Sequence, residues 1–451
     1  MTISLRDLSA CFEGVIPSII STVSSDRIPN ISYLSHVALI DDGHVALSNQ
    51  FFSKTAANIR ANPTAALILV DPRDGLQYRL VVSFDRSLDS GELFEEMAIQ
   101  LRATSTQINM GHVMRLRSID IYRVRSIDAI ASPTTSAAGS TSAASAPLAA
   151  AAAVTRRISE ENEIGAIIDA VLDGLRDGFG CDAAMLLLKD PADNRLVAVG
   201  SRGYPTTGIG SEVAVGEAVI GTAASERRPV RISDMSRIRR FGSAVQASSA
   251  EENLTRTIVL PGMADAMSQI ALPMIAHGAL RGVIFLESAE RLAFTKESEA
   301  SLSIVAAQAA SALALAENIG NDEPSIVTSV EASAPTEGRP FKVVHHAYDD
   351  SVFIDNEYLI KGVPGRLLVH LLGLHLRDGR VEFTNREIRL SDELRLPDFK
   401  DNLETRLLLL RRRLEDKAAP FRLLRTGRGK LRLQLAGPAL LETVKPKTSG
   451  R

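Results

Sequence analysis

The chain has 451 residues, of which 45% are hydrophobic and 23% charged, so it has the composition of a globular protein and enough length for about three domains. Cys11 and Cys181 are its only cysteines, which excludes a disulfide framework and a cysteine-ligated metal site and favours a cytoplasmic protein. Because there is no run of about 18 apolar residues and no signal-peptide pattern, we expect no membrane partner.

The formal net charge of −3 is distributed unevenly. From residue 341 onward there are 22 Lys and Arg residues against 15 Asp and Glu residues, a balance of +7 that leaves −10 for the rest of the chain. A basic end on an acidic body is typical of a protein that binds nucleic acid at that end. The competing interpretation is an ordinary solvated surface.

Two low-complexity stretches divide the chain. Residues 131–155 are almost entirely Ala, Ser and Thr, and residues 320–340 are also rich in small and polar side chains. Neither stretch has the large apolar side chains that a core requires, so both are predicted to be linkers. The end of the first stretch, Leu148 to Val154, could instead join a following helix. The predicted domains and tail are 1–130, 156–319, 341–440 and 441–451.

The first block shows short β-type runs that end in Asp, Gly or Pro turns, a pattern typical of a β-barrel or sandwich. Strands are expected at 16–23, 30–39, 44–49, 65–70 and 114–124, and a helix at 92–109. Between two of these strands, SNQFFSKTAANIRANP (residues 48–63) predicts a loop and a short helix. Lys54 and Thr55 stand at the helix start, where free N–H groups and the helix dipole favour a phosphate group.

This order of strands and the segment SNQFFSKTAANIRANPTAALILVD resemble the FMN-binding split-barrel family of pyridoxamine phosphate oxidases over residues 10–128. The resemblance implies a homodimer with FMN at its interface, although some relatives bind haem or a deazaflavin and others have lost the cofactor. The flavin or phosphate contacts that it implies are Ser35, His36, Ser48, Asn49, Gln50, Lys54, Thr55 and Asn58. We find no acid–base pair beside this loop and therefore name no catalytic residue.

The second block begins with an amphipathic pattern over residues 159–179 and ends with a predicted helix at 295–318. Between them, GEAVIGTAASERRPVRISDM (216–235) and SQIALPMIAHGALRGVIFLES (268–288) resemble GAF domains. The resemblance implies an α/β sandwich that receives an unknown small-molecule ligand or only transmits dimer geometry. The small residues of 301–318 predict a dimer helix.

The third block predicts a β-meander at 341–360, helices at 364–376, 385–394 and 398–416, and a hairpin at 421–435. This order resembles the winged-helix output domains of response regulators, most specifically in LRRRL (410–414) and LRTGRG (424–429). A helix in the major groove and a basic hairpin on the backbone are how such domains hold a duplex. The DNA contacts that the resemblance implies are Arg406, Arg411, Arg412, Arg425, Arg428, Lys430 and Arg432.

The periodicity of the last helix leaves two interpretations open. Leu403, Leu407 and Leu410 form one core-facing stripe, and Leu408 and Leu409 lie well away from it. Leucine cannot hydrogen-bond to base edges, so this face does not suit base recognition. The domain either binds DNA through backbone contacts and its hairpin or docks the two leucines on another domain or subunit.

The predicted architecture is therefore a multi-domain α+β chain: a split β-barrel, then a GAF α/β sandwich, then a winged helix. The first hypothesis for its function is a cytoplasmic sensor and transcriptional regulator that couples a flavin-type or small-molecule signal to DNA. The alternatives are a flavin-dependent oxidoreductase of the pyridoxamine phosphate oxidase type and a non-catalytic interaction protein. No P-loop, Gly-x-Ser-x-Gly, His-Glu-x-x-His or Rossmann pattern occurs, and we predict no metal site.

Overall fold

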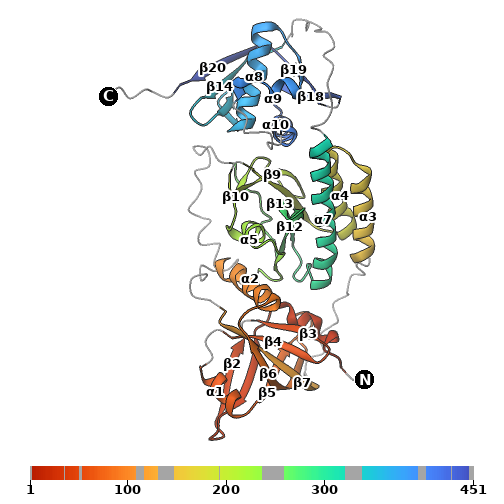
Figure 1. Ribbon diagram of the computed structural model, residues 1–451, viewed down its shortest axis with the longest axis vertical. Coiled ribbons are helices and arrows are strands. Elements are labelled where there is room, and N and C mark those ends of the chain that lie inside the picture. The colour runs from red at the N-terminus through yellow and green to blue at the C-terminus, as the bar shows by residue number, and fades with distance from the viewer. Residues whose placement is uncertain are drawn as a thin grey trace, which may run out of the picture.

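The computed structural model describes residues 3–34, 36–49, 53–107, 116–130, 147–191, 193–235, 258–319, 338–394, 403–427 and 429–445. These residues form three bodies that follow one another along the long axis of the molecule (Figure 1). We call them the N-terminal domain (3–130), the middle domain (147–319) and the C-terminal domain (338–445).

The N-terminal domain is built on one antiparallel sheet. Its strands are β1 (Ser18–Val23), β2 (Pro29–Leu34), β3 (Val37–Asp41), β4 (His44–Asn49), β5 (Thr64–Val70), β6 (Gln77–Leu88) and β7 (Ser118–Ile130). The strand order is β2-β1-β5-β6-β7-β4-β3, and the buried side chains include Ile20, Leu67, Leu80 and Tyr122. A 3-10 helix, η1 (Arg6–Glu13), and α1 (Ser53–Ala61) accompany the sheet, and α2 (Glu92–Gln107) lies between this domain and the middle domain (Figure 1).

Two strand predictions for this domain need correction, and one strand has no predicted counterpart. The strand expected at 30–39 is two strands, β2 and β3, which pair with different neighbours. The strand expected at 114–124 extends from Ser118 to Ile130, with residues 108–115 outside the described part of the chain. Strand β6 was not predicted, although Leu80 and Val82 alternate with less buried neighbours as a strand requires.

The middle domain has an antiparallel sheet with helices on both faces. Its strands are β8 (Ala183–Lys189), β9 (Arg195–Arg202), β10 (Glu212–Ala214), β11 (Val230–Ile232), β12 (Ser268–Ala276) and β13 (Ala279–Ser288). They lie in the order β10-β9-β8-β13-β12-β11. Helices α4 (Ile164–Phe179) and α7 (Lys296–Ile319) pack on one face together with Leu186 and Leu188, and α5 (Ala218–Glu226) packs on the other with Met185 and Leu187.

The start of the middle domain differs from the prediction. The helix expected at 159–179 is two helices, α3 (Pro147–Glu160) and α4. The linker predicted at 131–155 is shorter than expected, because residues 147–155 belong to α3, which agrees with the alternative that Leu148 to Val154 join a helix; residues 131–146 lie outside the described residues. Helix α3 packs closely because Gly174 of α4 faces Val154: a Cβ at Gly174 would lie 2.7 Å from Val154 Cγ1.

Helix α7 is a core helix of the middle domain. Its segment Lys296–Glu317 is long and apolar enough to span a membrane by length and composition, but half of it is buried. Val305, Ala309 and Leu313 are completely covered in the core formed with α3 and α4. The dimer role expected for 301–318 stays a prediction.

The C-terminal domain consists of two small sheets around a group of helices. The strands are β14 (Phe341–His346), β15 (Ser351–Ile354), β16 (Glu357–Ile360), β17 (Glu382–Thr384), β18 (Phe421–Gly427), β19 (Lys430–Leu435) and β20 (Ala439–Val444). The sheets have the orders β16-β15-β14-β20 and β17-β19-β18. The helices are α8 (Val363–Asp378), α9 (Asn385–Arg389), the 3-10 helix η3 (Asp392–Leu394) and α10 (Leu403–Asp416).

This domain follows the predicted order of elements with two differences. The tail expected at 441–451 begins too early, because β20 continues to Val444 and pairs in parallel with β14. The helix expected at 385–394 is divided into α9 and η3, with Leu390 and Ser391 between them. The helix expected from 398 is described from Leu403 onward.

Candidate functional site

Helix α10 is covered on two opposite sides. Leu403, Leu410 and Leu414 are buried in the core of the C-terminal domain. On the opposite side, Leu408 and Leu409 are only 6% and 8% exposed, because α10 also packs against α4 and β9 of the middle domain (Figure 1). The helix therefore joins two domains.

Arg412 makes the central polar contact between these two domains. Its Nη1 donates to the carbonyl oxygen of Val199 at 2.8 Å, and its Nη2 donates to the carbonyl oxygen of Gly165 at 3.1 Å and to Asp169 Oδ2 at 2.9 Å. Burial lowers the pKa of the Arg412 guanidinium, and the carboxylate of Asp169 opposes this shift. Gly200 leaves room for the guanidinium, since a Cβ there would lie 2.5 Å from Nη1.

Further polar contacts surround Arg412 at the edge of the same interface. They join a charged or hydroxyl side chain of the middle domain to one of the C-terminal domain: Asp190 to Arg406 (3.2 Å), Thr207 to Asp416 (2.7 Å), Glu212 to Lys361 (3.2 Å) and Glu163 to Arg425 (3.4 Å). Three of these four contacts pair a carboxylate of the middle domain with a basic side chain of the C-terminal domain.

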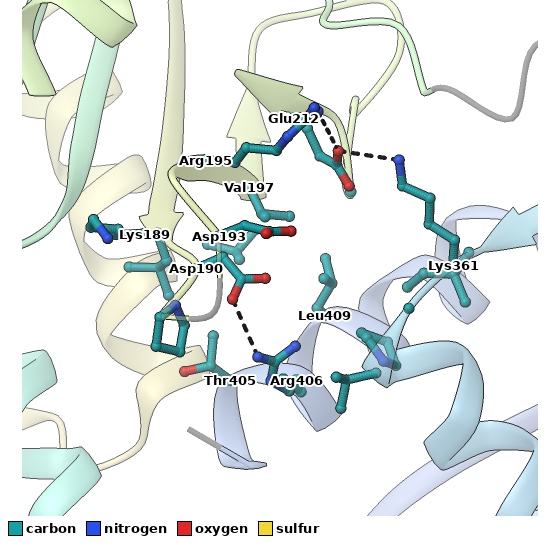
Figure 2. A pocket seen from close by; sticks show the side chains of 18 of the residues that line it. Lys189, Asp190, Asp193, Arg195, Val197, Glu212, Lys361, Thr405, Arg406 and Leu409 are labelled. Carbon is teal, nitrogen blue, oxygen red and sulfur yellow. Dashed lines mark hydrogen bonds and ion pairs between the residues drawn. The ribbon is translucent and has the colours of Figure 1, made fainter. Parts of the chain in front are cut away.

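A cavity of about 780 Å³ lies between the two domains beside these contacts (Figure 2). Its middle-domain wall includes Val197 and Asp193, whose carboxylate points into the cavity, and its other wall includes Leu409. Glu212 accepts from Arg195 at 3.0 Å as well as from Lys361. The hydroxyl of Thr405 is buried without a hydrogen-bond partner among the described residues. The lining can accommodate a small polar molecule.

The structure divides the predicted DNA contacts into two groups. Arg406 and Arg412 are buried against the middle domain, and Arg425 lies within ion-pair distance of Glu163 and Glu404. Arg411 and Lys430 are partly exposed and Arg432 is exposed on β19, whereas Arg428 lies outside the described residues. The hairpin is thus more accessible than the helix.

The predicted flavin residues of α1 belong to a polar cluster inside the N-terminal domain. Thr55 is buried, with its Oγ1 2.9 Å from Ser32 Oγ and accepting from Asn30 at 3.1 Å. Asn58 is also buried and donates to the hydroxyl of Thr22 at 3.1 Å. The cluster connects α1 to β1 and β2.

The remaining flavin residues are more scattered. Ser48 Oγ accepts from the backbone N–H of His36 at 3.1 Å, and Asn49 donates to Asp120 at 3.1 Å. Lys54 is exposed in the first turn of α1, whereas Ser35 and Gln50 lie outside the described residues. The buried hydroxyl and amide groups among these residues have protein partners, and their role in flavin binding stays a prediction.

His36 faces a second cavity of about 750 Å³, between the N-terminal and middle domains. Burial, and then the charge of Lys296, lower the pKa of His36 to about 4, so the imidazole is neutral near neutral pH. In the same wall, Arg231 contacts Glu13 of the N-terminal domain and lies 3.0 Å from Glu299. These charges join the two domains, and no pattern in the sequence indicated them.

One buried carboxylate of the middle domain was also missed by sequence reasoning. Glu287 is 2% exposed, accepts from Gln269 Nε2 at 2.7 Å and from the backbone N–H of Met263 at 3.1 Å, and has its pKa raised by burial. Its position in an apolar strand could have drawn attention to it. No comparable sequence pattern marks Asp169 or Asp190 as a contact residue.

Comparisons with known proteins identify two of the three domains. The family model for pyridoxamine 5'-phosphate oxidase matches residues 7–125, and the family model for the GAF domain matches residues 161–314. The chain therefore contains a pyridoxamine 5'-phosphate oxidase-like domain followed by a GAF domain, in a multi-domain α+β architecture. Both matches end before the C-terminal domain, whose resemblance to winged helices stays a prediction.

Solved structures resemble single parts of the chain. The GAF domain from Acinetobacter phosphoenolpyruvate-protein phosphotransferase is 19% identical, covers 39% of this chain and 97% of its own length, and has a TM-score of 0.32. An FMN-binding protein from Syntrophomonas wolfei subsp. wolfei is 17% identical, covers 29% of this chain and 90% of its own length, and has a TM-score of 0.24. Free methionine-R-sulfoxide reductase from Neisseria meningitidis is 15% identical, covers 40% of this chain and 96% of its own length, and has a TM-score of 0.31. No curated protein matches the chain.

Proposed function

We propose that the protein is a cytoplasmic, ligand-responsive transcriptional regulator whose C-terminal domain is a winged helix that binds DNA. The observation that carries this proposal is the order of elements in the C-terminal domain: a small sheet, then helices, then a basic β-hairpin. A domain built in this way presents one helix and one hairpin to a duplex. The hairpin carries Arg422 and Arg432, both exposed, beside the partly exposed Lys430.

The two preceding domains support the sensory half of the proposal. Pyridoxamine 5'-phosphate oxidase-like and GAF domains suggest a small-molecule sensing or flavin-related protein. The GAF domain contacts the C-terminal domain directly through α10. A change of state in the GAF domain can therefore reach the C-terminal domain without any further component. We propose a homodimer as the working assembly, as the resemblances imply.

The test is the affinity of the full chain for a fluorescent random-sequence duplex, measured by anisotropy over a range of salt concentrations. DNA binding through phosphate contacts weakens steeply as salt rises. Replacing Lys430 and Arg432 by alanine should weaken binding and reduce the salt slope by about 2. The matched control removes Lys342 and Arg377, two exposed cations elsewhere in the same domain. No binding at low salt, or equal losses in both variants, would contradict the proposal.

A flavoprotein of the pyridoxamine phosphate oxidase type is the second candidate. It is favoured by the family match over residues 7–125 and by the exposed Lys54 beside the polar cluster of α1. FMN would be the ligand, with the flavin phosphate near Lys54. An absorption spectrum of the purified protein, followed by a titration with FMN, tests this candidate directly.

A further inference from the structure

We propose that the contact between α10 and the GAF domain is autoinhibitory: the GAF domain covers the helix face that a duplex would need. This inference rests on the proposed DNA-binding function and adds its regulation. In the structure the chain is in the inhibited state, and the binding-competent state is one in which α10 has left the GAF domain.

The side of α10 that the GAF domain covers is the side that does not pack in the core of its own domain and could therefore contact a partner. The side of α10 that bears Leu403, Leu410 and Leu414 is committed to the core of its own domain. The opposite side bears Leu408 and Arg412, which contact the first turn of α4 and strand β9. A major groove about 12 Å wide admits a helix only when its outer side is free. The GAF domain and DNA therefore exclude one another at α10.

The charged contacts also indicate that the GAF domain and DNA cannot both bind α10 at the same time. Arg412 and Arg406 are cations expected to contact DNA. Arg412 instead forms an ion pair with Asp169 of the GAF domain, and Arg406 forms one with Asp190. Arg425 of the hairpin similarly lies 3.4 Å from Glu163. The GAF carboxylates thus stand where phosphate groups would stand, and both partners are recognised by the same guanidinium groups.

The interface is also suited to reversible opening. Asp169 is 44% exposed and Glu163 56% exposed, so water and salt reach these pairs and limit their strength. The cavity of about 780 Å³ has walls from both domains. A ligand that binds there contacts both walls only while the domains are docked, so its occupancy would shift the balance between the two states.

Autoinhibition of this kind has a quantitative consequence. When only a fraction of the molecules is undocked, the apparent Kd for DNA equals the intrinsic Kd divided by that fraction. A substitution on the GAF side that weakens docking leaves every DNA-contacting group intact and raises that fraction. It should therefore tighten DNA binding, and because the Asp169 carboxylate is partly exposed we expect an increase of about two- to fivefold in apparent affinity.

The experiment compares Asp169→Ala with Asp173→Ala in the full chain. Both residues lie on α4 and both form an ion pair with Arg202, at 2.9 Å and 2.7 Å, and they have similar exposure. Among the described contacts, only Asp169 also binds Arg412. The difference between the two variants therefore isolates the contact with the C-terminal domain. The readouts are the apparent Kd for a random-sequence duplex at low salt and hydrogen exchange of α10 without DNA.

The inference predicts that Asp169→Ala speeds exchange in α10 and tightens DNA binding, whereas Asp173→Ala changes neither. Faster exchange without tighter binding, in a protein that does bind DNA, would overturn autoinhibition and leave the proposed function standing. No DNA binding by wild type or either variant would instead refute the proposed function. Unchanged exchange in Asp169→Ala would show that the ion pair between Asp169 and Arg412 does not hold the two domains together, and would contradict the inference.

Discussion

Arg412 of α10 and Asp169 of α4 are 243 residues apart in the chain, yet their Nη2 and Oδ2 atoms are 2.9 Å apart. This ion pair connects a helix expected to contact DNA with the helix that opens the GAF domain. The same guanidinium also binds the backbone carbonyls of Val199 and Gly165. The C-terminal domain is thus held by backbone and side-chain acceptors of the GAF domain together.

A double-mutant cycle should show that Arg412 and Asp169 interact energetically. We expect Arg412→Ala to lower the free energy of unfolding by about 2 kcal/mol, because several hydrogen bonds to a charged group are lost. Asp169→Ala should cost less than about 1 kcal/mol, since its carboxylate is partly exposed. Urea unfolding should give a coupling of about 0.5–1 kcal/mol for this pair and additive effects for Arg412→Ala with Asp173→Ala.

The absence of a side chain at Gly200 should be necessary for docking. A Cβ there would lie 2.5 Å from Arg412 Nη1 and 2.9 Å from Leu172 Cδ1, so Gly200→Ala should displace Arg412 and lower stability by about 1–3 kcal/mol. A Cβ at Gly262 would meet no atom within 4 Å among the described residues, so Gly262→Ala serves as the control. Thermal unfolding of the two variants checks this, and equal melting temperatures would be inconsistent with a closely packed Arg412.

The neutral state of His36 predicts a pH dependence of stability. Its pKa is lowered from 6.5 to about 4 by burial, so between these pH values the unfolded state binds more protons than the folded state. The contribution of His36 to the free energy of unfolding is fully present above pH 6.5 and is lost as the pH falls toward 4. Because the ring is still partly exposed in its cavity, we expect a loss of about 1–2 kcal/mol.

His36→Gln should remove that part of the pH dependence. The backbone N–H of residue 36 still donates to Ser48 in this variant, so the local structure should persist. Urea unfolding at pH 7.5 and pH 5 should show a smaller difference for His36→Gln than for wild type. An unchanged difference would mean that the pKa of His36 is the same in the folded and the unfolded protein.

The contribution of Glu287 to stability should have the opposite pH dependence. Burial raises its pKa, so the folded state binds more protons than the unfolded state and stability falls as the pH rises from 4.5 through the folded pKa. Glu287→Gln keeps an oxygen that can accept from Gln269 and Met263 but removes the buried charge. We expect a higher melting temperature for Glu287→Gln than for wild type at neutral pH and a smaller gap at pH 4.5.

Lys54 gives a direct test of flavin binding. If the flavin phosphate lies at the start of α1, Lys54→Ala should weaken FMN binding by about tenfold, because a charge-assisted contact is lost. The same variant should bind riboflavin, which has no phosphate, as wild type does. Arg60→Ala, an exposed cation at the other end of α1, is the control. Fluorescence titrations that show no flavin binding at all would rule out FMN as the ligand.

The sequence predicted the order of the domains because each carries a strong local pattern. The segments from Ser48 to Asp71 and from Gly216 to Met235 indicated the first two domains, and the family matches at 7–125 and 161–314 confirm the resemblance there. Helix α3 was harder to predict. Its Ala-rich start looks like a linker, and only packing against Gly174 and α7 gives it a buried side.

The interdomain site could be predicted only in part. Leu408 and Leu409 lie off the core stripe of α10, and this feature correctly raised the possibility of docking on another domain. The acceptors could not be predicted, because two of them are backbone carbonyls, of Val199 and Gly165, which leave no trace in the side-chain pattern. Asp169 resembles any other surface carboxylate of an amphipathic helix.

The most direct test of mutual exclusion between the GAF domain and DNA is the distance between the two domains when DNA is bound. Dyes can be attached to Asp177→Cys on α4 and Arg377→Cys on α8, because both positions are exposed and the native Cys11 and Cys181 are buried. We predict that saturating random-sequence duplex lowers the energy transfer between the dyes as α10 leaves the GAF domain. Unchanged energy transfer in a fully DNA-bound sample would contradict mutual exclusion.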